Sequence, residues 1–157
     1  METRTIDQLL HEHEFFRGLD PAVLELIAGC GRNVTFEAGA YLFREGDPAD
    51  HFLILRSGRI ALEVHVPHLG PVVIDSPGEG DVVGVSWLFP PHRWQFDGRA
   101  LEQVRAVVLD GSCLRQKCEE DCRLGYDLMK RFAFILQDRL RSARMRLMDL
   151  YAHAGTG

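Results

Sequence analysis

Short apolar runs separated by turn-forming residues fill the middle of this chain, from Asn33 to about Asp110. In the run IALEVHV, residues 60–66, apolar residues alternate with Glu63 and His65, as in a strand with one buried face. The run HFLIL, residues 51–55, is apolar almost throughout. Many short strands broken by glycine and proline are typical of two sheet faces around one core. The pattern predicts a mainly β fold with flanking helices, built on a double-stranded β-helix, or jelly-roll, barrel over this stretch.

Helical signals appear on both sides of the strand-rich region. Asp20 is a suitable N-cap, Pro21 suits the first helical position, and the glycines that follow AVLELIA can end a short helix. From Glu119 to Tyr151 there is no glycine or proline after Gly125. We therefore expect short N-terminal helices and one long C-terminal helix over about residues 119–151.

The second half of the long helix carries apolar residues at alternating spacings of four and three, which indicates a coiled-coil-like seam. Contacts with the barrel are expected nearer the helix start, at Leu124, Leu128 and Phe132. A soluble monomer seldom leaves a stripe of this kind open. We therefore predict a homodimer joined through Leu136, Leu140, Ala143, Leu147 and Leu150.

Length and charge limit the classes of function. The 157 residues suit a single domain over residues 1–157, and the net charge of −5 argues against a general nucleic-acid binder. No apolar run reaches the ~20 residues of a membrane span, and the N-terminus lacks the pattern of a secretion signal, so we expect a cytoplasmic protein without membrane contacts. A local basic run is interpreted as a solvated helix face: Lys130, Arg131, Arg139, Arg141, Arg144 and Arg146.

The four cysteines match no common metal-binding spacing. They are Cys30, Cys113, Cys118 and Cys122, and no C-x-x-C pair is present. Because cytoplasmic proteins rarely use disulfides, small buried apolar thiols are the favoured interpretation for most of them. A redox or metal role for the last three stays open. The sequence predicts no metal site and no cofactor.

The order of these elements resembles a known family. A short helix is followed by FEAGAYLFREGDPADHFLILRSGRIAL, residues 36–62, then by GEGDVVG, residues 78–84, and then by the long helix. This order is similar to the cyclic-nucleotide-binding domain of the catabolite-activator (Crp/Fnr-like) superfamily, over roughly residues 15–151. The strongest segment is residues 36–62, in which five residues fall in the family's turn and strand positions: Gly39, Gly46, Asp50, Phe52 and Gly58.

The resemblance implies a ligand site with altered chemistry. Family members hold the ligand inside the barrel with a Gly-Glu step, whose carboxylate binds the ribose, and a downstream Arg followed by Ser or Thr, whose guanidinium binds the cyclic phosphate. Here Gly84 matches the glycine and Val85 replaces the glutamate. The downstream arginine falls at or next to Trp94, with Arg93 as its nearest basic neighbour, and Gln95 takes the place of the Ser/Thr. The candidate ligand-binding residues are Gly84, Val85, Ser86, Arg93, Trp94, Gln95 and Arg99.

Two questions about this site stay open at the level of sequence. Arg93 or Arg99 can replace the missing phosphate cation, or Arg93 can be an unpaired surface residue. Trp87 and Trp94 can line a pocket for a changed ligand, or they can fill the barrel.

Three functions follow, in order of preference. The first is a stand-alone regulatory or sensory domain that binds a nucleotide or another small molecule and signals through its dimer or an unidentified protein partner. The second is a degenerate scaffold that acts only through protein contacts. An enzyme comes last, because no catalytic motif is present. Since the sequence given has no helix-turn-helix segment after the long helix, we expect no direct DNA binding.

Overall fold

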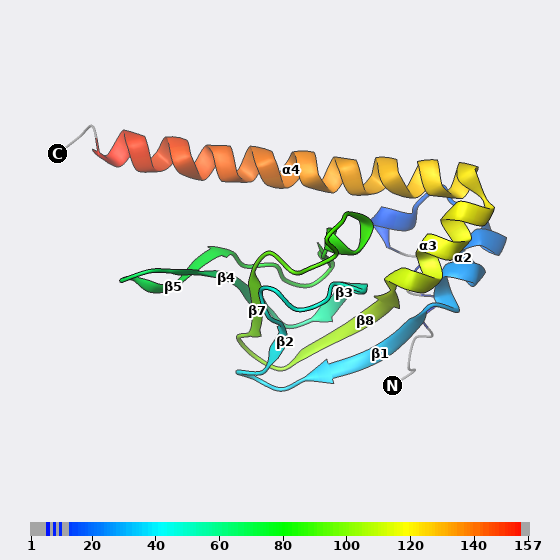
Figure 1. The fold of residues 1–157 in the computed structure, drawn as a ribbon, viewed down its shortest axis with the longest axis horizontal. Coiled ribbons are helices and arrows are strands. Elements are labelled where there is room, and N and C mark those ends of the chain that lie inside the picture. Colours follow the sequence, from blue (N-terminus) through cyan, green and yellow to red (C-terminus); the bar gives the residue numbers. More distant parts are fainter. Residues whose placement is uncertain (1–5, 7, 9, 11–12, 155–157) are drawn as a thin grey trace.

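Two antiparallel four-stranded sheets form the centre of the computed structural model, which describes residues 6, 8, 10 and 13–154 (Figure 1). The strand order is β1-β8-β3-β6 in one sheet and β2-β7-β4-β5 in the other. The strands are β1 (Gly31–Phe36), β2 (Tyr41–Phe43), β3 (His51–Ser57), β4 (Ile60–Val66), β5 (Gly70–Asp75), β6 (Val82–Val83), β7 (Asp97–Ala100) and β8 (Val104–Asp110).

The predicted mainly β fold is confirmed, but the closed barrel is not, because the two sheets are hydrogen-bonded separately. Closure would require ladders between β1 and β2 and between β5 and β6. Strands β2 and β6 contain only three and two residues, and they pair with β7 and β3, respectively. The result is a β-sandwich of two separate sheets.

Apolar side chains form two clusters, one between the sheets and one between the first sheet and the helices. Strand β3 supplies both, because successive side chains point to opposite faces of a sheet. Leu53 and Leu55 lie in the interior cluster, whereas Phe52 and Ile54 lie in the helix-side cluster. The continuous apolar run HFLIL is therefore a strand buried on both faces.

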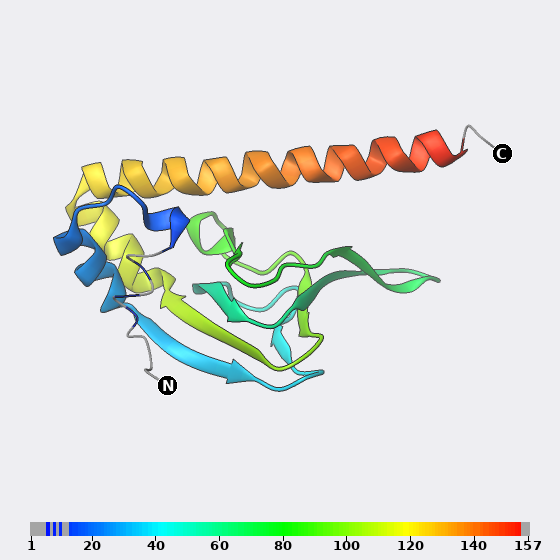
Figure 2. The same cartoon turned by 180° about the vertical axis from the view of Figure 1, so that it is seen from behind.

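The helices gather at one end and along one side of the sandwich (Figures 1 and 2). The predicted N-terminal helix is confirmed, and the Asp20 carboxylate accepts a hydrogen bond from the Ala22 N–H at 2.9 Å. The helical elements are η1 (Glu14–Phe16), α2 (Pro21–Ala28), η2 (Ser86–Leu88), α3 (Gly111–Glu120) and α4 (Cys122–Ala154).

The predicted long C-terminal helix over about residues 119–151 is confirmed as α4, but residues 119 and 120 end a separate helix, α3, and the two helices meet at Asp121. The Asp110 carboxylate accepts from the Cys113 N–H and begins α3. The Asp121 N–H then bonds back to the Lys117 carbonyl, while the Asp121 carboxylate accepts from the N–H groups of the next helix. Capping at Asp121 on both sides ends one helix and begins the other.

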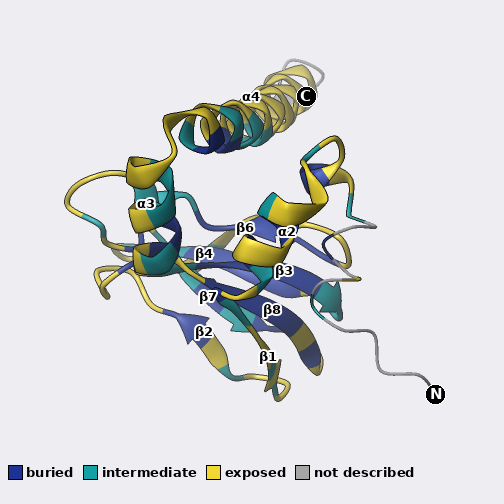
Figure 3. Cartoon of the chain, turned by 90° about the vertical axis from the view of Figure 1, so that its right-hand side faces the viewer, coloured by how far each residue is buried: buried dark blue, intermediate teal, exposed yellow. Residues whose placement is uncertain are grey.

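Helix α4 runs along the whole sandwich, and only its sandwich-facing side carries buried residues (Figures 1 and 3). Leu124, Leu128 and Phe132 are buried in the helix-side cluster, as predicted. From Leu136 onward, the described residues are exposed, apart from partly buried Arg139. The first half of α4 is therefore docked by apolar contacts, and the second half is not.

The cysteine interpretation was wrong for one pair. Cys30 and Cys113 form a disulfide with an S–S distance of 2.07 Å, which joins the segment after α2 to the first turn of α3. The Cys118 and Cys122 thiols are free. Burial, followed by the charges of Asp121 and Glu119, raises the pKa of the partly buried Cys118 thiol.

The described residues contain no group of three His, Cys, Asp or Glu side chains that could hold a metal ion. No helix in the described part of the chain combines the length and the apolar character needed to cross a bilayer.

Candidate functional site

The segment from β6 to β7 forms one wall of the site that the resemblance implies. After Val82–Val83, the chain turns at Gly84, whose φ of 108° is a conformation that other residues rarely adopt. A Cβ atom at Gly84 would lie only 2.7 Å from Cη2 of Trp94. Glycine is thus required both by the backbone turn and by the close approach of the indole.

Trp94 fills the space behind this turn. It is only 2% exposed, belongs to the interior cluster, and stacks on Phe43 with ring centroids 3.7 Å apart and planes 6° from parallel. Gly98 admits the Phe43 ring from the other side, because a Cβ atom there would lie 2.5 Å from it. At the position where the resemblance expects a phosphate-binding arginine, the structure has two packed aromatic rings.

The neighbours of Trp94 point away from the interior. Arg93 is exposed and donates to the Gly46 carbonyl at 2.7 Å, and Gln95 is exposed and donates to the Arg93 carbonyl at 3.0 Å. Strand alternation explains this placement, since flanking side chains take the face opposite to Trp94. The structure therefore places Arg93 and Gln95 outside the sandwich, on the segment between η2 and β7, with Arg93 bonded to the loop that follows β2.

Arg99, the other candidate cation, lies on β7 and pairs with Glu63 of β4. Its Nε donates to Glu63 Oε1 at 2.7 Å, and this hydrogen bond and the charge of Glu63 raise the pKa of Arg99. The alternation in IALEVHV suggested a solvated Glu63, but the carboxylate is buried. The cross-strand ion pair with Arg99 offsets part of the free-energy cost of burying the Glu63 carboxylate.

Val85, Ser86 and Trp87 belong to the short turn η2 and its approach. Val85 is partly buried and packs against the helix-side cluster, away from the interior cluster. Trp87 is fully buried and stacks on Phe52, and its Nε1 has no hydrogen-bond partner among the described residues. The two tryptophans therefore fill different places, Trp94 between the sheets and Trp87 beneath the helices.

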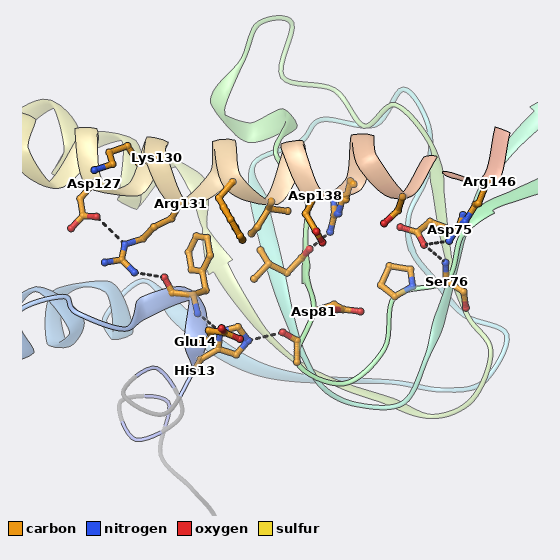
Figure 4. A pocket seen from close by; sticks show the side chains of 18 residues that line it. His13, Glu14, Asp75, Ser76, Asp81, Asp127, Lys130, Arg131, Asp138 and Arg146 are labelled. Atoms are coloured by element: carbon orange, nitrogen blue, oxygen red, sulfur yellow. Dashed lines mark hydrogen bonds and ion pairs between the residues drawn. The ribbon is translucent and has the colours of Figure 1, made fainter. Parts of the chain in front are cut away.

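An open cavity lies elsewhere, between α4 and the segment that leads into β6 (Figure 4). We call this cavity of about 760 Å³ the groove; it is lined by α4 residues 127–146, by segment 75–82 and by residues 13–15. Sequence reasoning missed it because the three segments are far apart along the chain. The only sequence feature that could have indicated the groove was the basic run on α4.

The interpretation of that run as a solvated face was wrong for Arg131 and Arg139, which are partly buried, while Arg146 is exposed but also bonds to the sandwich. Arg131, Arg139 and Arg146 donate to the backbone carbonyls of Phe15, Val82 and Ile74, respectively. Arg141 and Arg144 are exposed, as that interpretation requires. The arginines thus hold α4 to the sandwich and to the N-terminal segment across the groove.

The comparisons agree with this fold. The family model described as "Cyclic nucleotide-binding domain" matches residues 33–121, more than half of the chain. The chain belongs to this family. The cyclic nucleotide-binding domain is a regulatory module in its relatives, and the predicted Crp/Fnr-like kinship is confirmed.

The relatives include a "CRP-like cAMP-activated global transcriptional regulator" of Mycobacterium tuberculosis, 26% identical over 145 residues. The match covers 92% of this chain and 63% of that protein, so the chain spans less than two thirds of the relative. A solved structure from Geobacter metallireducens has a TM-score of 0.77 and 29% identity, with 88% of this chain and 99% of that chain covered. A cyclic nucleotide-binding domain from Methylobacillus flagellatus has the same fold, with a TM-score of 0.78, 19% identity and coverage of 92% and 82%.

Proposed function

We propose that this cyclic nucleotide-binding domain is a regulatory module whose interior ligand site is closed and whose signal passes through the pairing of α4. The observation that carries the proposal is the buried Trp94–Phe43 stack behind Gly84. In this proposal the stack takes the space in which the family binds the cyclic phosphate. Arg99 is neutralised by Glu63, and Arg93 is bound to the surface loop, so neither guanidinium faces the interior.

The energetic cost of these replacements is large. Each hydrogen bond to a charged group contributes about 1.5–3 kcal/mol, so the loss of the ribose carboxylate and the phosphate cation weakens binding by about 10²- to 10⁴-fold. A ligand entering the interior must also displace Trp94 from its apolar packing. We infer that cyclic nucleotides do not bind between the sheets with the affinity expected of a sensor.

The signalling surface in this proposal is the exposed stripe on α4: Leu136, Leu140, Ala143, Leu147 and Leu150. Leu140 is 67% exposed, and no described part of the chain covers the stripe. Two such stripes can bury each other around a two-fold axis, with the helices in contact at Ala143. A change in this pairing would alter the shape presented to a partner.

Titration calorimetry with cAMP and cGMP tests the closed interior. We expect no binding with a dissociation constant below about 1 µM in the wild type. The variant Trp94→Arg exchanges the stacked indole for the missing guanidinium and should bind at least about tenfold more tightly than the wild type. The single variant Arg93→Ala, which changes only the surface loop, serves as the matched control and should behave as the wild type.

Sub-micromolar binding of either nucleotide to the wild type, lost on Gly84→Ala, would place a working site in the interior and contradict the proposal. A scaffold that acts only through protein contacts remains the second candidate. The filled interior is consistent with a scaffold as well as with a regulatory module. The two candidate functions differ in whether a small molecule binds elsewhere on the domain.

A further inference from the structure

The groove has the size and the position of a ligand site that is separate from the sandwich interior. Its volume of about 760 Å³ lies in the range of small-molecule pockets, ~300–1,000 Å³. Figure 4 shows charged side chains converging on it from α4, from the segment before β6 and from η1. None of the candidate ligand-binding residues from the sequence lines it.

Arg139 is the central cation of the groove. Its guanidinium is largely desolvated, and this burial lowers its pKa although Asp75, Asp81 and Asp138 oppose the shift. Within the described part of the chain it makes one hydrogen bond, to the Val82 carbonyl, and no ion pair. A guanidinium has five N–H donors, so most of its capacity to bind an anion is unused.

The other charged side chains that line the groove determine what kind of ligand fits. Two carboxylates are already paired, Asp127 with Arg131 at 2.9 Å and Asp75 with Arg146 at 3.0 Å. The other lining charges are three carboxylates, Glu14, Asp81 and Asp138, and two cations, Lys130 and Arg139.

Neither a phosphate nor a simple cation matches that balance. A doubly charged phosphate would face three carboxylates that no described cation pairs, and a cation alone would face the desolvated Arg139. A molecule with one carboxylate and one ammonium group satisfies both signs. The carboxylate can meet Arg139 in a bidentate contact, and the ammonium can meet Asp81 or Asp138.

Apolar side chains in the lining provide room for the body of such a molecule. Phe15, Pro77, Phe134 and Ile135 line the groove beside the charged groups. Phe134 is 71% exposed, although it neighbours the partly buried Ile135. An aromatic ring on the ligand would cover part of this exposed surface.

We propose that the groove binds a zwitterionic small molecule, an aromatic amino acid or a short peptide with free termini, with Arg139 as the carboxylate anchor. The ligand bridges α4 and segment 75–82, which are joined here by the hydrogen bonds of Arg139 and Arg146. Binding therefore stiffens the attachment of the second half of α4. The inference stands apart from the closed interior, because it uses other residues and another ligand.

Ligand-observed NMR and thermal shift with four probes test the charge requirement. L-phenylalanine and the dipeptide Phe-Gly each carry both charges, phenylalanine amide lacks the carboxylate, and N-acetylphenylalanine lacks the ammonium. We expect binding of one or both zwitterions and affinities at least about tenfold weaker for the two singly charged analogues. The stronger binder of the first two identifies an amino acid or a peptide as the ligand.

Variants then locate the site. Arg139→Gln should weaken the bound zwitterion at least about tenfold, and Asp81→Asn with Asp138→Asn should weaken it by a similar factor. Arg141→Gln removes an exposed arginine of the same helix that does not line the groove, and it should leave binding unchanged. Melting temperatures within about 2 °C of the wild type show that the variants are folded.

Three outcomes would overturn the inference: no binding of either zwitterion, equal binding of the singly charged analogues, or binding that Arg139→Gln leaves unchanged. None of them bears on the proposed closure of the interior, which is measured with cyclic nucleotides and with a variant at Trp94.

Discussion

The two halves of α4 have similar apolar content but opposite surroundings. In the first half Leu124, Leu128 and Phe132 are buried against the sandwich, whereas in the second half Leu136 and Leu140 are exposed. The side of the second half that faces the sandwich carries Arg139, Ser142 and Arg146 in their place. Guanidinium and hydroxyl groups line the groove where leucines would have closed it.

Helix geometry explains the change. The five apolar residues of this series lie four positions apart, and on a helix with 3.6 residues per turn each step of four rotates the side chain by about 40°. By Leu140 the stripe has turned by about 160° from Leu124. With a constant spacing of four, an apolar stripe rotates around the helix and leaves the face that contacts the sandwich. Beyond Leu136 the spacing alternates between four and three, so the stripe stays on one new face of the helix.

The largest effect on the fold is expected from a buried residue of the first half. Phe132→Ala should lower the free energy of unfolding by about 3–5 kcal/mol, because it empties a site that is 2% exposed and packed against Phe15, Phe52 and Trp87. Met148→Ala, in the second half of the same helix at a position that is 61% exposed, should change it by less than about 0.5 kcal/mol. Urea unfolding measures both, and equal losses would show that the two halves are not distinct.

A smaller loss is expected when the anchored end is loosened. Replacing Cys30 and Cys113 by serine removes a cross-link between residues 83 positions apart and should lower the free energy of unfolding by about 2–4 kcal/mol. Cys118→Ser with Cys122→Ser changes the same number of thiols without a cross-link and serves as the control. Unfolding curves recorded with and without a reducing dithiol should show a shift only in the chain that contains Cys30 and Cys113. A curve that the dithiol leaves unmoved would mean that this disulfide does not stabilise the fold.

The smallest effect on the single chain is expected in the second half, where the change appears in assembly. Leu140→Asp with Leu147→Asp places two carboxylates in the proposed seam, and light scattering should report one chain at micromolar concentration where the wild type gives two. The circular dichroism of the folded chain should be retained. Met145→Asp with Met148→Asp makes the same chemical change at exposed positions off the seam and should leave the dimer intact. A wild-type mass of one chain would remove the dimer from the proposed function.

The strands and the docked half of α4 were accessible to sequence reasoning, because they depend on local periodicity. The alternation in IALEVHV and the apolar run HFLIL each specify a buried face, and Asp20-Pro21 specifies a helix start. The charged segment of α3 lacks a clear apolar stripe, and its two aspartate caps were not recognised as the ends of a separate helix.

The site was less accessible, because its contacts join residues that are distant in sequence. Sequence reasoning identified the exchange at Trp94 but left open whether the indole lines or fills the interior; its stack on Phe43 depends on β2 and β7 being neighbours. The Arg99–Glu63 pair likewise depends on the pairing of β4 with β7. The disulfide and the groove needed the positions of whole segments, which no spacing of cysteines or arginines encodes.

Strand β5 is one of the two edge strands of its sheet, and an exposed edge can pair with a strand from another molecule. Here Pro71 has no N–H to offer, and Arg146 of α4 already occupies the Ile74 carbonyl. The hydrogen bond from Arg146 therefore does more than hold the helix in place. It blunts an edge that carries the exposed side chains of Val73 and Ile74, and so it protects the domain against edge-to-edge aggregation.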